Sequence, residues 1–255
     1  MPQGPLALYR ARRGTGTLKA DAAQEYAAER LQSLYAALKD YRPSTGKAGW
    51  RERFGLARRQ AAPEPPQGLY LYGDVGRGKS MLMDLFFETA PVERKRRVHF
   101  HAFMIEVHRR LHEMRNARAG KADRSVDESL PELARQLADE AWLLCFDEFH
   151  VTDIADAMIL GRLFTALFEH GVVVVSTSNW PPDDLYKDGL QRHLFLPFIA
   201  LLKERMDVVE LSGPVDYRLD RLKGETVYLQ PLGPASHQAV ESIFAGLTEG
   251  RTVSP

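Results

Sequence analysis

The chain has 255 residues, 44% of them hydrophobic and 27% charged, and its 34 Lys and Arg are balanced by 34 Asp and Glu. This composition excludes wholesale disorder, and zero net charge argues against a protein that coats nucleic acid or anionic lipid with its whole surface. The single cysteine, Cys145, excludes an intrachain disulfide. Because it lies in an apolar run, we predict that it is a buried small hydrophobe.

No segment predicts a membrane span or a secretion signal. The longest apolar run, residues 194–202, contains Pro197 and is far shorter than the roughly 20 residues that a spanning helix needs. The N-terminus has no apolar segment ahead of its arginines, as a signal peptide would require. We therefore expect a cytoplasmic protein without a transmembrane segment.

The N-terminal part predicts a leader, one helix and a linker. Residues 1–20 are interpreted as an extended leader. Asp21, with Gln24 three positions later, resembles a capping box, and apolar residues then recur at helical spacing. Residues 42–67 are rich in Gly, Pro and Arg, which is typical of a linker, with a short helix expected at 50–59.

From residue 68 onward, strand-like and helix-like patterns alternate. Strands are predicted at residues 68–72, 98–101, 142–146 and 172–176 with a last strand from 208, and helices at 80–89, 102–118, 130–141, 154–170 and 194–205. The alternation favours an α/β fold, a three-layer α/β/α sandwich around a mostly parallel sheet of five strands. After residue 213 the pattern weakens to a strand at 226–229 and a helix at 236–247.

A glycine-rich segment follows the first predicted strand of this sheet and opens a predicted helix. It matches the phosphate-loop pattern G-x-x-x-x-G-K-[ST]. Its eight positions are Gly73, Asp74, Val75, Gly76, Arg77, Gly78, Lys79 and Ser80. Glycines let successive backbone N–H groups point at phosphate oxygens, and the following helix N-terminus adds partial positive charge. We predict that Lys79 binds the β- and γ-phosphates of ATP and that the Ser80 hydroxyl binds Mg²⁺.

Two acids follow the apolar run at residues 143–146. A strand buried on both faces has this composition, and ligands of parallel sheets lie beyond the carboxyl ends of the strands. We predict that Asp147 holds Mg²⁺, directly or through water, and that Glu148 deprotonates the water that attacks the γ-phosphate. Residues 147–150 also spell a DExH helicase box, but such helicases use two motor domains, for which this chain is too short.

Two further polar residues are candidates for the same site. Asn179 follows the valine-rich strand, where its amide would position the attacking water; alternatively, it caps a turn before Pro181. Arg192 precedes an apolar helix and is a candidate arginine finger that stabilises transition-state charge in a neighbouring subunit. An ordinary surface arginine has the same sequence signature.

The middle of the chain is unevenly charged. Residues 91–121 contain nine Lys or Arg and three Glu, whereas residues 123–148 contain eight acids and two Arg. The basic part, residues 94–121, is interpreted as a solvated helix face, with contacts to nucleic acid, an acidic partner or a neighbouring subunit as alternatives. A histidine cluster in the same part is expected to be structural rather than to bind zinc, because neither a Cys nor an HExxH pattern accompanies it. The cluster comprises His99, His101, His108 and His112.

Longer strings around these motifs resemble the ZapE/AFG-like ATPase family over most of the chain. The strings are GLYLYGDVGRGKSMLMDLFF, HFHAFMIEVH, LLCFDEFHVTDIADAMILGRLF and TSNWPPDDLYKDGLQRHLFLPFI. The resemblance implies an AAA+-type P-loop ATPase core that binds ATP and Mg²⁺. By this resemblance, the loop at 73–80 is Walker A, Asp147 and Glu148 are Walker B, Asn179 is sensor 1, and Arg192 is the candidate finger.

The resemblance also carries expectations about partners and domains. Bacterial members of the family are associated with the division-ring protein FtsZ and mitochondrial members with protein quality control. It therefore implies a homo-oligomer that remodels a protein client, with a mitochondrial location for a eukaryotic relative. Family members usually continue into a helical lid with a sensor-2-type arginine, which Arg218 replaces poorly, so a reduced or truncated lid is expected. The domains expected are 1–67 (leader, helix and linker), 68–213 (ATPase core) and 214–255 (C-terminal segment).

Three functions compete on these grounds. The leading one is Mg²⁺-dependent binding and hydrolysis of ATP coupled to remodelling of a protein partner. The second is an AAA+ loader that associates with nucleic acid through residues 94–121. The third is a phosphotransferase acting on a small molecule, which the acidic pair argues against because a kinase does not need the water-activating Glu148.

Overall fold

The computed structural model describes residues 4–43, 64–116 and 126–213. The described residues up to Asp74 and from Gly78 to Ser212 form one compact unit, whereas Val75–Arg77 and Gly213 belong to a second. The helices and strands given below lie in the first unit.

Within residues 4–43 the chain forms two helices, α1 (Pro5–Gly14) and α2 (Ala22–Asp40). The strands are β1 (Gly68–Tyr72), β2 (Lys95–His99), β3 (Leu143–Asp147), β4 (Val173–Ser178) and β5 (Met206–Glu210). Between them lie the helices α4 (Lys79–Thr89), α5 (Phe100–Asn116), α6 (Val126–Glu140), α7 (Ile154–Glu169) and α8 (Leu196–Arg205), with 3₁₀ turns η1 (Pro182–Asp184) and η2 (Arg192–Leu194) before α8.

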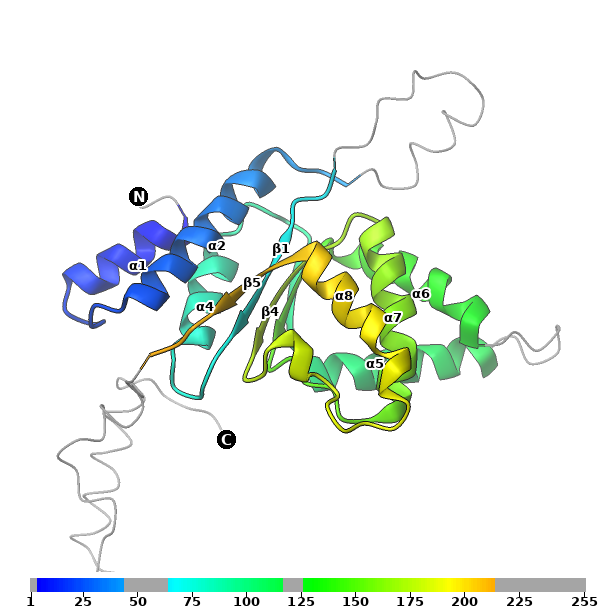
Figure 1. The fold of residues 1–255 in the computed structure, drawn as a ribbon. Helices are drawn as coiled ribbons and strands as arrows, with labels where there is room; N and C mark the ends of the chain where they lie inside the picture. The colour runs from blue at the N-terminus through cyan, green and yellow to red at the C-terminus, as the bar shows by residue number, and fades with distance from the viewer. Residues whose placement is uncertain (1–3, 44–63, 117–125, 214–255) are drawn as a thin grey trace, which may run out of the picture. The chain divides into compact units, whose positions relative to one another are not determined.

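The five strands form one parallel sheet in the order β2-β3-β4-β1-β5. One hydrophobic cluster packs α5, α6, α7 and α8 on one face, and a second packs α1, α2 and α4 on the other (Figure 1). β3 and β4 are buried along their whole length, because they have neighbours on both sides and helices on both faces. The predicted three-layer α/β/α sandwich with five strands is confirmed.

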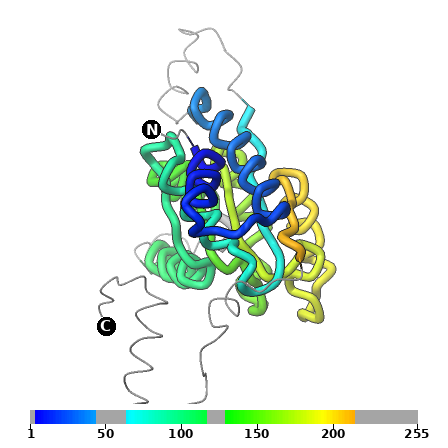
Figure 2. Tube along the Cα trace, turned by 90° about the vertical axis from the view of Figure 1, so that its left-hand side faces the viewer, coloured from blue at the N-terminus to red at the C-terminus, as the bar shows by residue number. Residues whose placement is uncertain are grey.

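The prediction of an extended leader at residues 1–20 is wrong. Helix α1 starts at Pro5, a position where the missing N–H has no helical partner to lose. It lies beside α2 (Figure 2), with Tyr9 fully buried and Arg13 paired with Glu25. Packing against neighbouring helices therefore stabilises a short helix that its Gly- and Pro-containing sequence did not indicate.

The expected start of α2 is confirmed. The Asp21 carboxylate accepts hydrogen bonds from the backbone N–H groups of Ala23 (2.8 Å) and Gln24 (3.1 Å). These bonds satisfy donors that have no partner inside the helix. Further along α2, Arg30 pairs with Asp207 of the edge strand β5 (2.6 Å). This ion pair ties α2 to that edge of the sheet.

The largest boundary error in the sheet concerns β2, which was predicted at 98–101 but spans Lys95–His99, so that α5 begins at Phe100. Its first three residues are basic, and this composition hid the strand from a reading based on hydrophobic pattern. The expected helix at 50–59, strand at 226–229, helix at 236–247 and lid position Arg218 lie outside the described residues.

Cys145 lies in the middle of β3 and is fully buried, as predicted. Burial raises the pKa of its thiol to about 12, so the thiol stays protonated and unreactive near neutral pH.

Across the described ranges, no helix is both long enough and apolar enough to cross a membrane.

Gly68 begins β1 where this strand approaches β4. A Cβ atom on Gly68 would lie 1.9 Å from the Val174 carbonyl oxygen, which belongs to the backbone of a central strand. We expect Gly68→Ala to lower the free energy of unfolding by about 1–3 kcal/mol, because the added methyl group forces the two strands apart. Urea unfolding followed by circular dichroism measures this change.

Gly161→Ala is the matched control for that variant. Gly161 lies inside α7, and the nearest atom to an added Cβ is 3.7 Å away, so the methyl group fits. Replacing a glycine by alanine in a helix is expected to raise stability by up to about 1 kcal/mol. Equal stability of the two variants would contradict the close approach of β1 and β4.

Candidate active site

The polar residues singled out in the sequence follow three neighbouring strands. β1 leads into the glycine-rich loop, β3 ends at Asp147, and β4 ends at Ser178, directly before Asn179. β3, β4 and β1 are adjacent and parallel. Their carboxyl ends therefore meet at one edge of the sheet, the edge at which ligands of open α/β sheets bind.

The phosphate loop uses glycine at two positions where a side chain would clash. Gly73 has a φ of +146°, and a Cβ there would lie 2.5 Å from a carbonyl oxygen of the segment after β5. Gly78 precedes α4 with a φ of +85°, and its Cβ would lie 2.8 Å from Gln24 Nε2. The Lys79 ammonium donates hydrogen bonds to the carbonyl oxygens of Gly73 (2.6 Å) and Asp74 (2.8 Å). A cation and a helix N-terminus therefore meet at this loop, as an anion site requires.

The contact of α2 with the loop was not predicted from the sequence. Gln24 is 3% exposed, and its side-chain oxygen accepts a 3.5 Å hydrogen bond from the Tyr9 hydroxyl. The sequence indicated Gln24 as part of a helix cap and contained no signal for the other end of the side chain. Helix α2 thus packs directly against Gly78 through Gln24, and α1 supports Gln24 through Tyr9.

The tip of the loop belongs to the second unit. Val75 is half-exposed, and Gly76 has a φ of 81°. Arg77 is buried, and a Cβ on Gly213 would lie 2.2 Å from its Nη2 atom. Arg77 therefore lies against Gly213 rather than extending into solvent.

Asp147 and Glu148 are adjacent but have different environments. Asp147 is 8% exposed, whereas the side chain of Glu148 is 80% exposed. Glu148 has a φ of 55°, in the left-handed region that non-glycine residues rarely adopt. Such strain costs about 1–3 kcal/mol and persists where the surroundings enforce it, commonly at functional sites. Here it turns the Glu148 carboxylate to solvent.

Strand β4 and the aromatic core hold this turn in place. The backbone N–H of Glu148 donates to Thr177 Oγ1 (3.3 Å), and that of Phe149 donates to the Thr177 carbonyl oxygen (2.7 Å). The Ser178 hydroxyl donates to the Phe149 carbonyl oxygen (2.7 Å). The Phe149 ring is buried and lies 4.0 Å from the Phe100 ring between centroids. A rigid core residue therefore determines where the neighbouring carboxylate lies.

Asn179 and Arg192 lie in different segments. Asn179 is exposed just beyond β4, at the edge described above. The next residue, Trp180, accepts a hydrogen bond at its carbonyl oxygen from the Tyr70 hydroxyl (2.9 Å), which anchors this part of the chain to β1. Arg192 begins η2, and its Nη2 donates to the carbonyl oxygen of Asp183 in the same chain.

Arg97 is a site residue that the sequence analysis missed. Its Nε and Nη2 atoms donate to the two carboxylate oxygens of Asp147 (2.7 and 3.1 Å), and its Nη1 donates to Asp84 on α4. Burial by itself would lower the pKa of Arg97, but the hydrogen bonds and charges of Asp147 and Asp84 outweigh it and raise that pKa. This contact follows from the pairing of β2 with β3, which places Arg97 opposite Cys145. Asp147 is two residues further along β3 and therefore on the same face of the sheet.

Other basic side chains on β2, directly before it and on α5 also have partners within the chain. Arg94 donates to the Asp139 carbonyl, Lys95 to the carbonyls of Phe87 and Ala90, Arg96 pairs with Glu106, Arg109 with Glu113, and Arg110 with Glu106 and Glu140. Part of the acidic segment at 123–148 therefore neutralises part of the basic segment in one chain. This pairing argues against an uncompensated basic patch on the described part of 94–121.

Three histidines of this region, His99, His108 and His112, contact polar groups of the same chain. His108 Nε2 lies 2.6 Å from Asp156 Oδ1 and links α5 to α7. His112 lies 2.9 Å from Asn116, and His99 Nδ1 lies 3.9 Å from a Glu148 carboxylate oxygen. Among the residues that the structure describes, no three His, Cys, Asp or Glu side chains are grouped as a metal site.

A family model described as AFG1-like ATPase matches residues 4–254. This chain belongs to the AFG1-like ATPase family. The match confirms the family resemblance that the motif strings indicated.

Two relatives of this AFG1-like chain illustrate the similarity. It is 40% identical over 240 residues to cell division protein ZapE of Escherichia coli. The aligned region covers 92% of this chain and 62% of that protein. It is 41% identical over 271 residues to lactation elevated protein 1 homolog B of Danio rerio, covering 91% of this chain and 53% of that protein. The chain therefore spans between half and two thirds of the length of these relatives. Its fold also superposes on AMPPCP-bound DnaA from Aquifex aeolicus with a TM-score of 0.45 at 13% identity, over 92% of this chain and 64% of that one.

The donors at the AFG1-like site fit Mg²⁺. Ser80 is the second residue of α4 and is exposed, and Asp147 supplies a carboxylate at the end of β3. Mg²⁺ prefers such hard oxygen ligands and is usually bound by one or two protein groups together with waters and substrate phosphates. The two oxygen donors of Ser80 and Asp147 therefore match the usual number of protein ligands for Mg²⁺.

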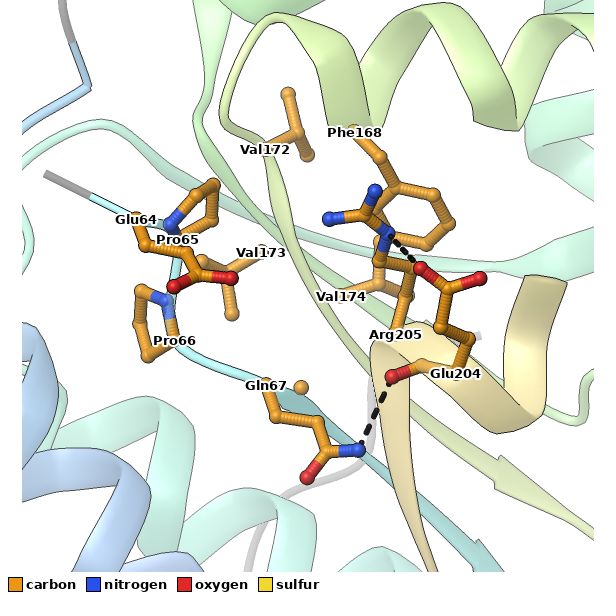
Figure 3. A pocket seen from close by; sticks show the side chains of 11 residues that line it. Glu64, Pro65, Pro66, Gln67, Phe168, Val172, Val173, Val174, Glu204 and Arg205 are labelled. Atoms are coloured by element: carbon orange, nitrogen blue, oxygen red, sulfur yellow. Dashed lines mark hydrogen bonds and ion pairs between the residues drawn. The ribbon is translucent and has the colours of Figure 1, made fainter. Parts of the chain in front are cut away.

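A cavity of about 430 Å³ lies at the other end of the strands in this AFG1-like fold (Figure 3). Its lining includes Gly68 and Val173, the first residues of β1 and β4. Within its lining, Gln67 donates to the Glu204 carbonyl oxygen (3.1 Å), and Glu204 pairs with Arg205. Because it opens at the amino ends of these strands, this cavity is separate from the phosphate-loop edge.

Proposed function

We propose that this chain binds ATP with Mg²⁺, hydrolyses it, and couples hydrolysis to the remodelling of a protein partner. The observation that carries the proposal is the position of Glu148. A strained turn presents its carboxylate to solvent at the same sheet edge at which β1 enters the phosphate loop. A general base needs this access to water together with a nearby phosphate site.

Each site residue has one role in this mechanism. Lys79 and the backbone N–H groups of the loop bind the phosphates, and Ser80 with Asp147 holds Mg²⁺, which neutralises phosphate charge when bound. Glu148 accepts a proton from a water that Asn179 orients. The water oxygen bonds to the γ-phosphorus while the bond from that phosphorus to the β–γ bridging oxygen breaks, releasing ADP and phosphate.

Phosphate release without an acceptor separates this ATPase from a small-molecule phosphotransferase. We expect the purified protein to release phosphate from MgATP when water is the sole acceptor, and to stop releasing it in EDTA. A coupled phosphate assay measures both rates, and AMPPCP, which has no cleavable β–γ oxygen bridge, serves as the substrate control. Release that requires an added acceptor would contradict hydrolysis.

The partner and assembly state form part of the same proposal. The ZapE relative is a cell division protein, and a client of the division-ring type, FtsZ, is proposed on that basis, in a cytoplasmic setting. Arg192 lies among exposed leucines, namely Leu190 (70%), Leu194 (53%) and Leu196 (45%). An apolar surface around a cation suits contact with a second subunit, to which Arg192 would supply an arginine finger.

The domain boundaries at 67 and 213 also belong to this proposal.

Nucleic acid is not favoured as the partner. Binding to a phosphate backbone depends on cations that exchange small counterions for phosphates. Arg94 directly before β2, Arg96 and Arg97 on β2, and Arg110 on α5 are bonded to carboxylates or carbonyls of this chain.

A further inference from the structure

Arg97 connects two parts of the proposed nucleotide site. It lies on β2, inside the basic segment at 94–121 and outside the phosphate loop and the acidic pair. On one side it donates two hydrogen bonds to Asp147 at the end of β3, and on the other it donates to Asp84 of α4. α4 is the helix that carries Lys79 and Ser80. One side chain therefore links both elements that would supply ligands to Mg²⁺.

The contact between Arg97 and Asp147 is a partly buried, two-point interaction. The two side chains are 23% and 11% exposed, whereas those of the surface pair Arg109 and Glu113 are 57% and 59% exposed. Two parallel hydrogen bonds fix the orientation of a carboxylate as well as its charge. An ionised carboxylate has about four lone-pair sites, so Asp147 retains acceptors for a cation while it is bonded to Arg97.

We propose that Arg97 is a positioning residue of the magnesium site, holding the Asp147 carboxylate in one orientation and tying β3 to α4 through Asp84. This inference rests on the proposed function, because it takes Asp147 and Ser80 as Mg²⁺ ligands. Hydrogen-bond partners behind a metal ligand typically contribute about 10- to 100-fold to metal affinity. Without Arg97, the Asp147 carboxylate would have to be reoriented each time that the cation binds.

Arg97→Gln tests the inference by a binding measurement that needs no turnover. A fluorescent ATP analogue is titrated into the protein in EDTA, and Mg²⁺ is then titrated at a fixed nucleotide concentration. We expect the metal-free affinity to stay within about twofold of that of the unaltered chain and the half-maximal Mg²⁺ concentration to rise about tenfold or more. Arg97→Lys, which keeps the charge but not the planar two-point donor, is expected to give an intermediate rise.

Arg96→Gln is the matched control. It makes the same charge change on the neighbouring residue of β2, whose side chain pairs with Glu106 of α5 on the opposite face of the sheet. We expect its Mg²⁺ titration to match that of the unaltered chain. Thermal unfolding of each variant is measured in parallel. Should Arg97→Gln not fold, Arg97→Lys and Asp84→Asn carry the test, the latter with a smaller rise in the Mg²⁺ requirement.

Three results have distinct consequences. An unchanged or lower Mg²⁺ requirement in the Arg97 variants would overturn the inference, since a lower one means that Arg97 competes with the cation for Asp147. An equal loss of metal-free and metal-dependent binding would also overturn it, because that pattern marks a general structural role. Absence of nucleotide binding in the unaltered chain would instead remove the proposed function.

Discussion

Glu148→Gln is expected to bind ATP as the unaltered chain does. We expect its hydrolysis rate to be lower by a factor of about one hundred or more. General-base catalysis by a positioned side chain contributes about 10²- to 10⁴-fold, and an amide cannot accept the proton. Glutamine has nearly the same shape and can occupy the same strained turn, which β4 holds through the Thr177 contacts. Binding is measured with a fluorescent nucleotide and turnover by phosphate release.

Glu113→Gln is the control for this variant. Glu113 lies on α5, is largely exposed, and pairs with Arg109 on the surface, so the same chemical change there should leave turnover unaltered. Hydrolysis by Glu148→Gln at the rate of the unaltered chain would contradict the assignment of Glu148 as the general base. The same variant, which is expected to retain ATP, also offers a means of isolating the protein client from cells.

Lys79→Ala is expected to abolish detectable ATP binding. Hydrogen bonds to charged groups contribute about 1.5–3 kcal/mol each, so losing the contacts to two phosphates weakens binding by about a hundredfold or more. In the present structure the Lys79 ammonium already lies at the loop, bonded to the carbonyl oxygens of Gly73 and Asp74. Alanine is well tolerated at the start of a helix, so the fold should survive.

Lys203→Ala serves as the matched control for loss of a lysine. Lys203 of α8 pairs with Asp183 of η1 (2.8 Å), and both side chains are largely exposed. We expect its ATP affinity to equal that of the unaltered chain. Isothermal titration calorimetry measures both variants, with thermal unfolding to verify that each is folded. Retained tight binding by Lys79→Ala would show that the phosphates bind elsewhere.

Local sequence pattern predicted the central fold well because its signals are short-range. The alternation of apolar strands with helices indicated the parallel sheet, and the order of the phosphate loop, Asp147 and Asn179 placed all three at strand ends. The cap at Asp21 was also readable, since a carboxylate and the N–H groups it accepts are neighbours in sequence. In each case the sequence signal itself is contained within a few neighbouring residues.

Predictions failed where long-range contacts outweigh local preference. The sequence predicts an extended leader in place of α1 because Gly and Pro disfavour a helix locally, yet Tyr9 is buried against neighbouring elements. β2 was placed late because its first residues are basic, and a strand with charged residues is stable here because acids on flanking helices pair with them. The left-handed turn at Glu148 likewise depends on Thr177 of another strand.

By itself, the sequence determined where the candidate motifs lie: a phosphate loop, an acidic pair and a polar strand end, each encoded within a few positions. The tertiary structure decided how the charges of the chain are distributed. The zero net charge conceals a basic and an acidic segment, and folding brings parts of them together, as in the pairs of Arg97 with Asp147 and Arg110 with Glu140. Those partners depend on strand register and helix placement, and hydrophobic packing sets both across tens of residues. No local pattern specifies them.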